Sequence, residues 1–146
     1  MARPVRIEYE GSVYHVTIRG NNRNAIFAED SDRERFLADL EESVQRFDVR
    51  LYLFCLMTNH VHLVLETPRA NLSSFMHRLQ TAYTVYFSHR HHQSGHLMQG
   101  RSQMALARWH LTQGKRGLAL DLAVGSRGRW HTEVCSLRSS GYNIHP

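Results

Sequence analysis

The sequence predicts an α+β fold in which helices cover one face of an antiparallel sheet. Segments with strand patterns alternate with two longer segments whose apolar residues recur at helical spacing. Two of the apolar runs, residues 49–57 and 60–66, are separated by two residues only. Such a short connection favours a hairpin, and strands joined by a hairpin are antiparallel. At 146 residues, the chain has the length of one domain with its own hydrophobic core.

Periodicity marks the first strand and the first helix. "SVYHVTIRG", residues 12–20, alternates between two faces before Gly20 begins a polar loop. Ser31 and Glu34 fit the reciprocal hydrogen bonds of a capping box, and the first turn after them is acidic. The spacing therefore predicts a helix over residues 31–47. Its apolar stripe consists of Phe36, Leu37, Leu40, Val44 and Phe47.

A hairpin and a second helix follow. "VRLYLFCLM" is continuously apolar, which is typical of a central strand, and Thr58 and Asn59 can turn the chain into "HVHLVLE". Asn71 can cap a second helix. The apolar face of that helix consists of Leu72, Phe75, Met76, Leu79, Tyr83, Tyr86 and Phe87. Strand, helix, strand, strand, helix is the order of the first five elements of a ferredoxin-like unit, which has six.

The C-terminal part of the chain loses this pattern. From about residue 102 no helical or strand period is evident, apart from one apolar stretch, "LALDLAV". We expect a domain over residues 1–101 and a divergent, partly disordered basic tail over 102–146. Residues 1–70 contain nine Arg against eleven acidic residues, whereas residues 71–146 contain nine Lys and Arg against two acidic residues. The net charge of +5 is thus concentrated in the second half.

The amino-acid composition indicates which class of molecule the protein binds. Seventeen of the eighteen cationic residues are Arg, which binds phosphate with two parallel hydrogen bonds and stacks on bases, so nucleic acid is the first candidate. A GC-rich coding sequence would favour Arg as well. Cys55 and Cys135 match no zinc or disulfide spacing, and no apolar run is long enough to cross a membrane. We expect a soluble, cytoplasmic protein without a membrane partner.

His60 and His62 are the candidate metal ligands. Side chains at i and i+2 of a strand leave the same face, so the two imidazoles can share a divalent ion. The same spacing also occurs on any half-exposed strand, and a catalytic metal usually has three protein ligands. A metal-dependent phosphoesterase that uses this pair with an acid such as Glu66 is one interpretation. His15, on the first strand, is more typical of a satisfied structural residue.

Four motifs together carry a family resemblance. "GSVYHVTIRGNNRNAIF", "FCLMTNHVHLVLE", "FMHRLQTAYTVYFSHRH" and "SGHLMQGR" resemble the REP-associated tyrosine transposases and related small single-tyrosine transposases, over about residues 3–101. The resemblance implies a ferredoxin-like fold and a Mg²⁺ or Mn²⁺ ion on His60 and His62. It also implies a tyrosine that attacks single-stranded or hairpin DNA to give a 5′-phosphotyrosine. It further implies a monomer or homodimer in the bacterial cytoplasm, associated with the nucleoid.

The position of the nucleophile departs from the family pattern. The family places its tyrosine near position 119, where this chain has "GLALD". Tyr142 is the only tyrosine beyond Tyr86 and is therefore the candidate nucleophile, while Tyr83 and Tyr86 lie on the apolar stripe and favour packing. We interpret the loss of pattern after residue 101 as the product of a frameshift or truncation. The alternative to an active transposase is a non-catalytic module that binds hairpin DNA or RNA.

Polar residues beside the predicted strands are the candidate DNA contacts. Arg and Asn side chains are suited to phosphate and base-edge hydrogen bonds. The loop "RGNNR" is also compatible with an ordinary Asn/Gly turn. In the resembling family this region helps to recognise a hairpin. The predicted DNA contacts are Arg19, Asn21, Asn22, Arg23, Arg90 and Arg101.

Overall fold

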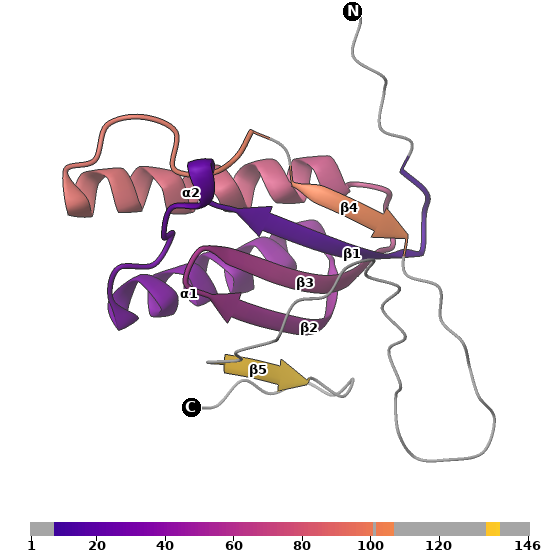
Figure 1. Ribbon diagram of the computed structural model, residues 1–146. Coiled ribbons are helices and arrows are strands. Elements are labelled where there is room, and N and C mark those ends of the chain that lie inside the picture. Colours follow the sequence, from indigo (N-terminus) through magenta and orange to yellow (C-terminus); the bar gives the residue numbers. More distant parts are fainter. Residues whose placement is uncertain (1–7, 101, 107–133, 138–146) are drawn as a thin grey trace, which may run out of the picture.

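The computed structural model describes residues 8–100, 102–106 and 134–137 of the chain. Its elements are β1 (Ser12–Arg19), the short 3-10 helix η1 (Asn21–Arg23), α1 (Asp30–Phe47), β2 (Arg50–Met57), β3 (His60–Thr67), α2 (Leu72–His91), β4 (Gln103–Leu106) and β5 (Val134–Leu137). The strands form one sheet in the order β4-β1-β3-β2-β5, and all neighbours are antiparallel. Figure 1 shows β1 and β3 in the middle of this sheet.

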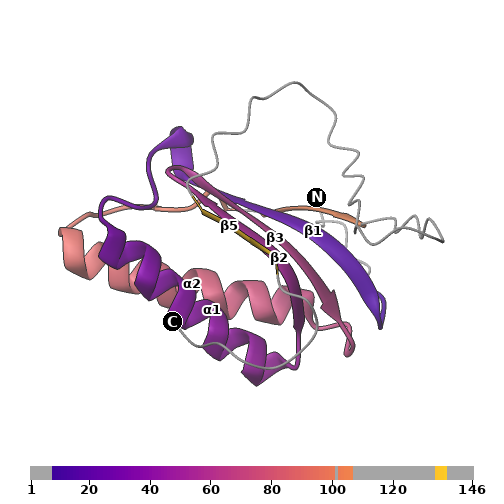
Figure 2. The same ribbon diagram turned by 90° about the horizontal axis from the view of Figure 1, so that it is seen from below.

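The order β4-β1-β3-β2 is that of a ferredoxin-like unit, and both helices pack on one face of the sheet (Figure 2). The predicted α+β class is therefore confirmed. The sixth element, β4, begins at residue 103, where no strand was expected, because only four residues pair there and most of them are exposed. Most of the expected tail over residues 102–146, including Tyr142, lies outside the described residues, and so does Arg101 at the end of the expected domain. The boundary at residue 101 stays a prediction.

The hydrophobic core lies between the helices and the sheet. From β1 and β3 it takes every second residue, and Val61, Leu63 and Leu65 have no exposed surface. Two aromatic residues of the helices, Phe36 and Tyr83, meet edge to face with ring centres 5.2 Å apart. On the opposite face, Cys55 and Val64 are also buried, but neither belongs to this core cluster.

Both helix starts differ in detail from the prediction. The capping box of α1 uses Glu29 and Asp32 rather than Ser31 and Glu34, because the helix begins at Asp30 and its cap residue lies two positions before Ser31. The buried Asp32 carboxylate accepts hydrogen bonds from the backbone of Ala28 at 2.8 Å and of Glu29 at 3.0 Å. At the start of α2, Asn71 occupies the cap position but makes no capping hydrogen bond. Its amide donates instead to the carbonyl of Phe47, at 2.8 Å.

The β2–β3 hairpin turns at Thr58 and Asn59, as predicted. Its turn is joined to the loop after β1, since Gly20 N donates to Asn59 O at 2.9 Å and Ile26 N to Thr58 O at 2.9 Å. A side chain at position 20 would place a Cβ only 2.1 Å from the carbonyl oxygen of Asn24. Only glycine allows this close approach. None of the described helices is long and apolar enough to cross a membrane.

Candidate metal centre and nucleic-acid interface

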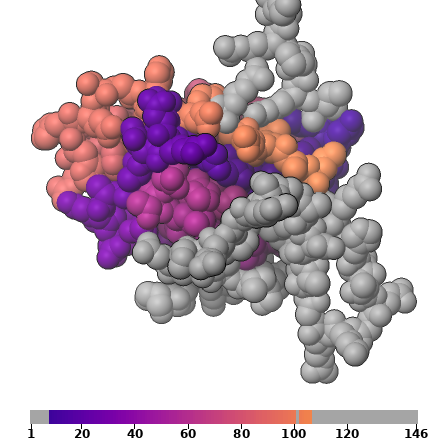
Figure 3. Space-filling view, viewed as in Figure 1, coloured from indigo at the N-terminus to yellow at the C-terminus, as the bar shows by residue number. Residues whose placement is uncertain are grey.

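The site lies on the face of the sheet that the helices leave open. The register of β1 with β3 pairs Thr17 with His62 and Arg19 with His60. Because successive side chains alternate, these residues and His15 point away from the helices, and both paired histidines are half-buried. Figure 3 shows the molecule from the same direction as Figure 1. The surface of the β2–β3 hairpin is magenta and lies beside the indigo residues of β1 and the loop after it.

His62 is held by two residues of β1. Its Nδ1 atom lies 3.0 Å from Nε2 of His15 and 3.2 Å from the hydroxyl oxygen of Thr17. The two imidazole planes differ by only 6°, and their centres are 5.2 Å apart. His15 therefore belongs to the site as a partner of His62. The alternation of β1 places His15 and Thr17 on one face, but only the pairing of β1 with β3 reveals their neighbour.

His60 lies beside His62, with the ring centres 4.9 Å apart and the planes nearly perpendicular at 82°. Its Nδ1 atom lies 2.6 Å from Oδ1 of Asn59. The amide nitrogen of Asn59 in turn donates to the carbonyl oxygen of Arg23, at 3.3 Å. A chain of contacts thus connects the loop after β1 to one of the two candidate ligands.

Burial and neighbouring positive charge keep the imidazoles neutral. The pKa of His62 is lowered to about 4, mainly by burial and in addition by its neighbours His60, His15 and Arg19. Burial and the Arg19 guanidinium lower the pKa of His60, and burial lowers the pKa of His15. A neutral imidazole has a nitrogen lone pair, which is the form that binds a metal.

The donor set fits a divalent cation in part. Two neutral imidazoles on one rigid strand are suitable ligands, but within the described ranges no group of three His, Cys, Asp or Glu side chains is arranged to hold a metal. Glu66, four residues beyond His62 on β3, pairs with Arg50 at 3.2 Å and accepts a hydrogen bond from Tyr52. Its carboxylate is thus engaged elsewhere, which gives no support to a phosphoesterase built on Glu66.

The described tyrosines lie away from the histidine pair. Tyr83 is fully buried between the helices and the sheet, where its hydroxyl donates to the carbonyl of Ile26 at 2.6 Å, and burial raises its pKa. Tyr86 is on the same helix and contacts Asp32. Tyr52 is on the open side, but burial and its hydrogen bond to Glu66 raise its pKa. The predicted packing role of Tyr83 and Tyr86 agrees with these contacts.

The predicted DNA contacts fall into two groups. Arg19, at the end of β1, lies next to the histidine pair, followed by η1 with the half-buried Asn21 and the exposed Asn22 and Arg23. Asn22 and Arg23 have positive φ angles of 53° and 61°, so the loop curls tightly. Arg90 lies apart from them, near the end of α2, where it forms an exposed ion pair with Glu29 at 3.4 Å.

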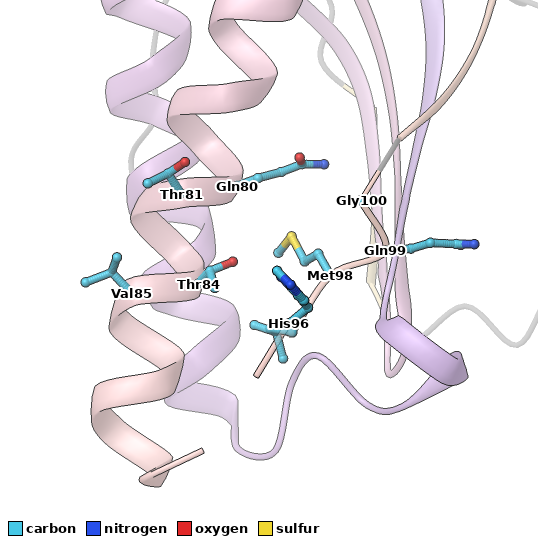
Figure 4. A pocket seen from close by; sticks show the side chains of 9 residues that line it. Gln80, Thr81, Thr84, Val85, His96, Met98, Gln99 and Gly100 are labelled. Carbon is cyan, nitrogen blue, oxygen red and sulfur yellow. The ribbon is translucent and has the colours of Figure 1, made fainter. Parts of the chain in front are cut away.

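A small open pocket lies between α2 and residues 96–100 (Figure 4). Its volume is about 230 Å³, and its lining includes Gln80, Thr84, His96 and Met98. Residues 97–99 follow the end of β1, because Asn21 N donates to Leu97 O at 2.9 Å and Gln99 N to Arg19 O at 2.8 Å. This strand-like segment therefore lines the pocket and also pairs with the end of β1.

Comparisons with known proteins agree with this architecture. The family model described as "Transposase IS200 like" matches residues 8–104. A solved REP-associated tyrosine transposase bound to a REP hairpin has a TM-score of 0.59 at 14% identity over 74% of this chain, which spans 63% of that protein's length. A candidate transposase of Deinococcus radiodurans has a TM-score of 0.56 at 17% identity, covering 73% of this chain and 87% of its own. None of the curated protein sequences compared with the chain matches it.

Proposed function

This chain belongs to the IS200-like transposase family, and from that membership we propose that it binds hairpin DNA with a single-stranded flank on the open face of its sheet. We further propose that His60 and His62 hold Mg²⁺ or Mn²⁺ beside a phosphodiester of the bound strand. The observation that carries the proposal is the pair of neutral, half-buried imidazoles on the face of the central strand β3 that points away from the helices.

The loop after β1 supplies the binding surface. Arg19 pairs in register with His60, so its guanidinium lies where a phosphate beside the histidines would be neutralised. On the adjoining loop, the exposed Asn22 and Arg23 and the half-buried Asn21 offer hydrogen bonds to base edges and backbone. One solved relative of this fold is described with a REP hairpin bound, which is consistent with the proposal. Arg90 and Arg101 stay proposed contacts, but Arg90 lies apart on α2 and Arg101 lies outside the described residues.

The bound cation would act as a Lewis acid that draws charge from a phosphate oxygen. The chain's own residues do the rest. Arg19 adds a second positive charge at the same place, and the apolar face of β3 fixes the strand from which both imidazoles project. A tyrosine oxygen would attack phosphorus, the bond to the 3′ oxygen would break, and the 3′ oxygen would leave with a proton as a hydroxyl.

Tyr142 is the proposed nucleophile, and it lies outside the described residues. Within the described part, each tyrosine is either packed in the core, bound to Glu66 or placed before β1. This observation favours a second candidate function, a domain that binds hairpin nucleic acid without cutting it. Both functions use the same open face and differ only in the covalent step.

The decisive experiment uses a synthetic DNA hairpin with labelled single-stranded flanks, incubated with the full chain and Mn²⁺. A transposase would give a covalent protein–DNA adduct in a denaturing gel, and peptide mass spectrometry would locate it at Tyr142. His60→Ala and His62→Ala should abolish the adduct and keep binding in a gel shift. His77→Ala, which removes an exposed histidine of α2, is the matched control.

Binding without an adduct would establish the non-catalytic candidate. An adduct that persists in His60→Ala would contradict the metal assignment. Absence of hairpin binding by the unmodified chain would contradict both functions. Size-exclusion chromatography with light scattering, run on the same samples, would show whether the active species is a monomer or a homodimer.

A further inference from the structure

The two candidate ligands, His60 and His62, have one feature in common: the Nδ1 atom of each ring is in hydrogen-bond contact with a neighbouring side chain. We propose that Asn59 and His15 are positioning residues that keep a hydrogen on Nδ1 of His60 and His62. Both rings then present the Nε2 lone pair to the cation. The inference rests on the proposed function for its purpose, but the position of the hydrogens is a property of the metal-free chain.

For His60 the direction of the hydrogen bond follows from the amide of Asn59. The amide nitrogen Nδ2 donates to the carbonyl oxygen of Arg23, so Oδ1 is the end that faces His60, at 2.6 Å from Nδ1. A carbonyl oxygen only accepts hydrogen bonds, so Nδ1 of His60 must donate. A neutral imidazole has one N–H group. The lone pair of His60 is therefore on Nε2.

For His62 the contact with His15 has the geometry of an in-line hydrogen bond. A ring nitrogen lies about 1.1 Å from the imidazole centre, so two coplanar rings that share such a bond have centres about 5.2 Å apart. The ring planes are within 6° of parallel, and the centre distance of 5.2 Å is what the 3.0 Å contact between the two nitrogens gives when both nitrogens lie on the line between the centres. Two nitrogens that point at each other do not converge on a third atom. His15 is therefore a hydrogen-bond partner of His62 and not a third ligand.

The direction of this bond decides whether His62 can bind a cation. If His62 Nδ1 donates to His15 Nε2, the lone pair of His62 is on Nε2. The reverse direction would put the hydrogen on His62 Nε2 and block coordination there. Thr17 is compatible with the first arrangement, because its hydroxyl oxygen, 3.2 Å from the same Nδ1, can accept as well as donate.

The arrangement couples the DNA-binding loop to the cation. The carbonyl that orients Asn59 belongs to Arg23, in the loop proposed to contact DNA, and Gly20 N also donates to the backbone oxygen of Asn59. A movement of this loop would release the Asn59 amide and leave His60 without its acceptor. DNA that orders the loop would then strengthen cation binding, and the cation would strengthen DNA binding by the same factor.

The test compares Asn59→Ala with Asn59→Asp, which restores an acceptor, and with Thr58→Ala, an exposed neighbour in the same turn. Long-range ¹H–¹⁵N spectra of the metal-free protein report which ring nitrogen carries the hydrogen. We expect Nδ1–H at His60 in the unmodified chain and a shift toward Nε2–H in Asn59→Ala. The Mn²⁺ dissociation constant, measured by calorimetry, should rise roughly tenfold to a hundredfold in Asn59→Ala and recover in Asn59→Asp.

His15→Phe, compared with His15→Gln, makes the same test for His62. Thermal melts followed by circular dichroism confirm folding, which the Asn59 variants should keep because the backbone oxygen still accepts from Gly20. Nε2–H at either paired histidine in the metal-free wild type would overturn the inference, as would Mn²⁺ affinity unchanged in Asn59→Ala. If the wild type bound no Mn²⁺, the proposed metal function would fail, and the spectra alone would decide the hydrogen positions.

Discussion

Lowering the pH should weaken cation binding far less than it would for two ordinary histidines. Two imidazoles with the usual pKa would lose about fifteenfold in affinity between pH 8 and pH 6, because each must be neutral to bind. Here the pKa of His62 is about 4, so this ring stays neutral throughout that range. The pKa of His60 is also below its usual value. The loss should therefore stay below about fourfold, the limit set by one ordinary histidine.

Calorimetric titration of the full chain with Mn²⁺ at pH 8, 7 and 6 measures this directly. Arg19→Gln should steepen the pH dependence, because the Arg19 charge lowers the pKa of both His60 and His62. Arg23→Gln removes an equal charge from the same loop without contributing to either shift, and serves as the control. A fifteenfold loss in the unmodified chain would refute the claim that burial and Arg19 keep the pair neutral.

Three further predictions concern stability, each measured by urea unfolding. Tyr83→Phe should cost about 1–2 kcal/mol by leaving the buried carbonyl of Ile26 without its donor. Asp32→Ala should cost about 3 kcal/mol, and the loss should shrink in the His91→Ala background, because His91 lies 2.9 Å from this carboxylate. The depressed pKa of His62 should give the fold a stability that is complete above pH 6.5 and is lost as pH falls toward 4. His62→Gln should flatten that decline, and an unaltered profile would contradict it.

The arrangement of helices and strands was predictable because each element has its own apolar period. The second helix follows from residues such as Leu72 and Phe75, which recur at helical spacing and prove to be buried. The cap residue of α1 was not predictable. Ser31 is a commoner cap residue than Glu29, and the choice between them depends on where the loop from β1 enters the helix. β4 could not be predicted because it has only four residues, too few for a sequence period, and its strand conformation depends on pairing with β1.

The candidate site was predictable in part for a similar reason. The spacing of His60 and His62 is enough to place them on one face of a strand. The contribution of His15 depends on the register that sets β1 beside β3, and that of Asn59 depends on a carbonyl 36 residues earlier in the chain. Such partners are brought together by the tertiary fold, so no local sequence pattern predicts them.

Because the helices pack on one face of the sheet only, the residues that stabilise the fold and the residues of the candidate site lie on different faces. The helices meet one side only, and the core cluster that stabilises the chain is on that side, whereas His60, His62 and Thr17 project from the other. Changes among the outward residues disturb few apolar contacts, so they should alter reactivity while the protein stays folded. During evolution, proteins with this arrangement could therefore lose, exchange or regain the outward-facing side chains of the candidate site and still fold.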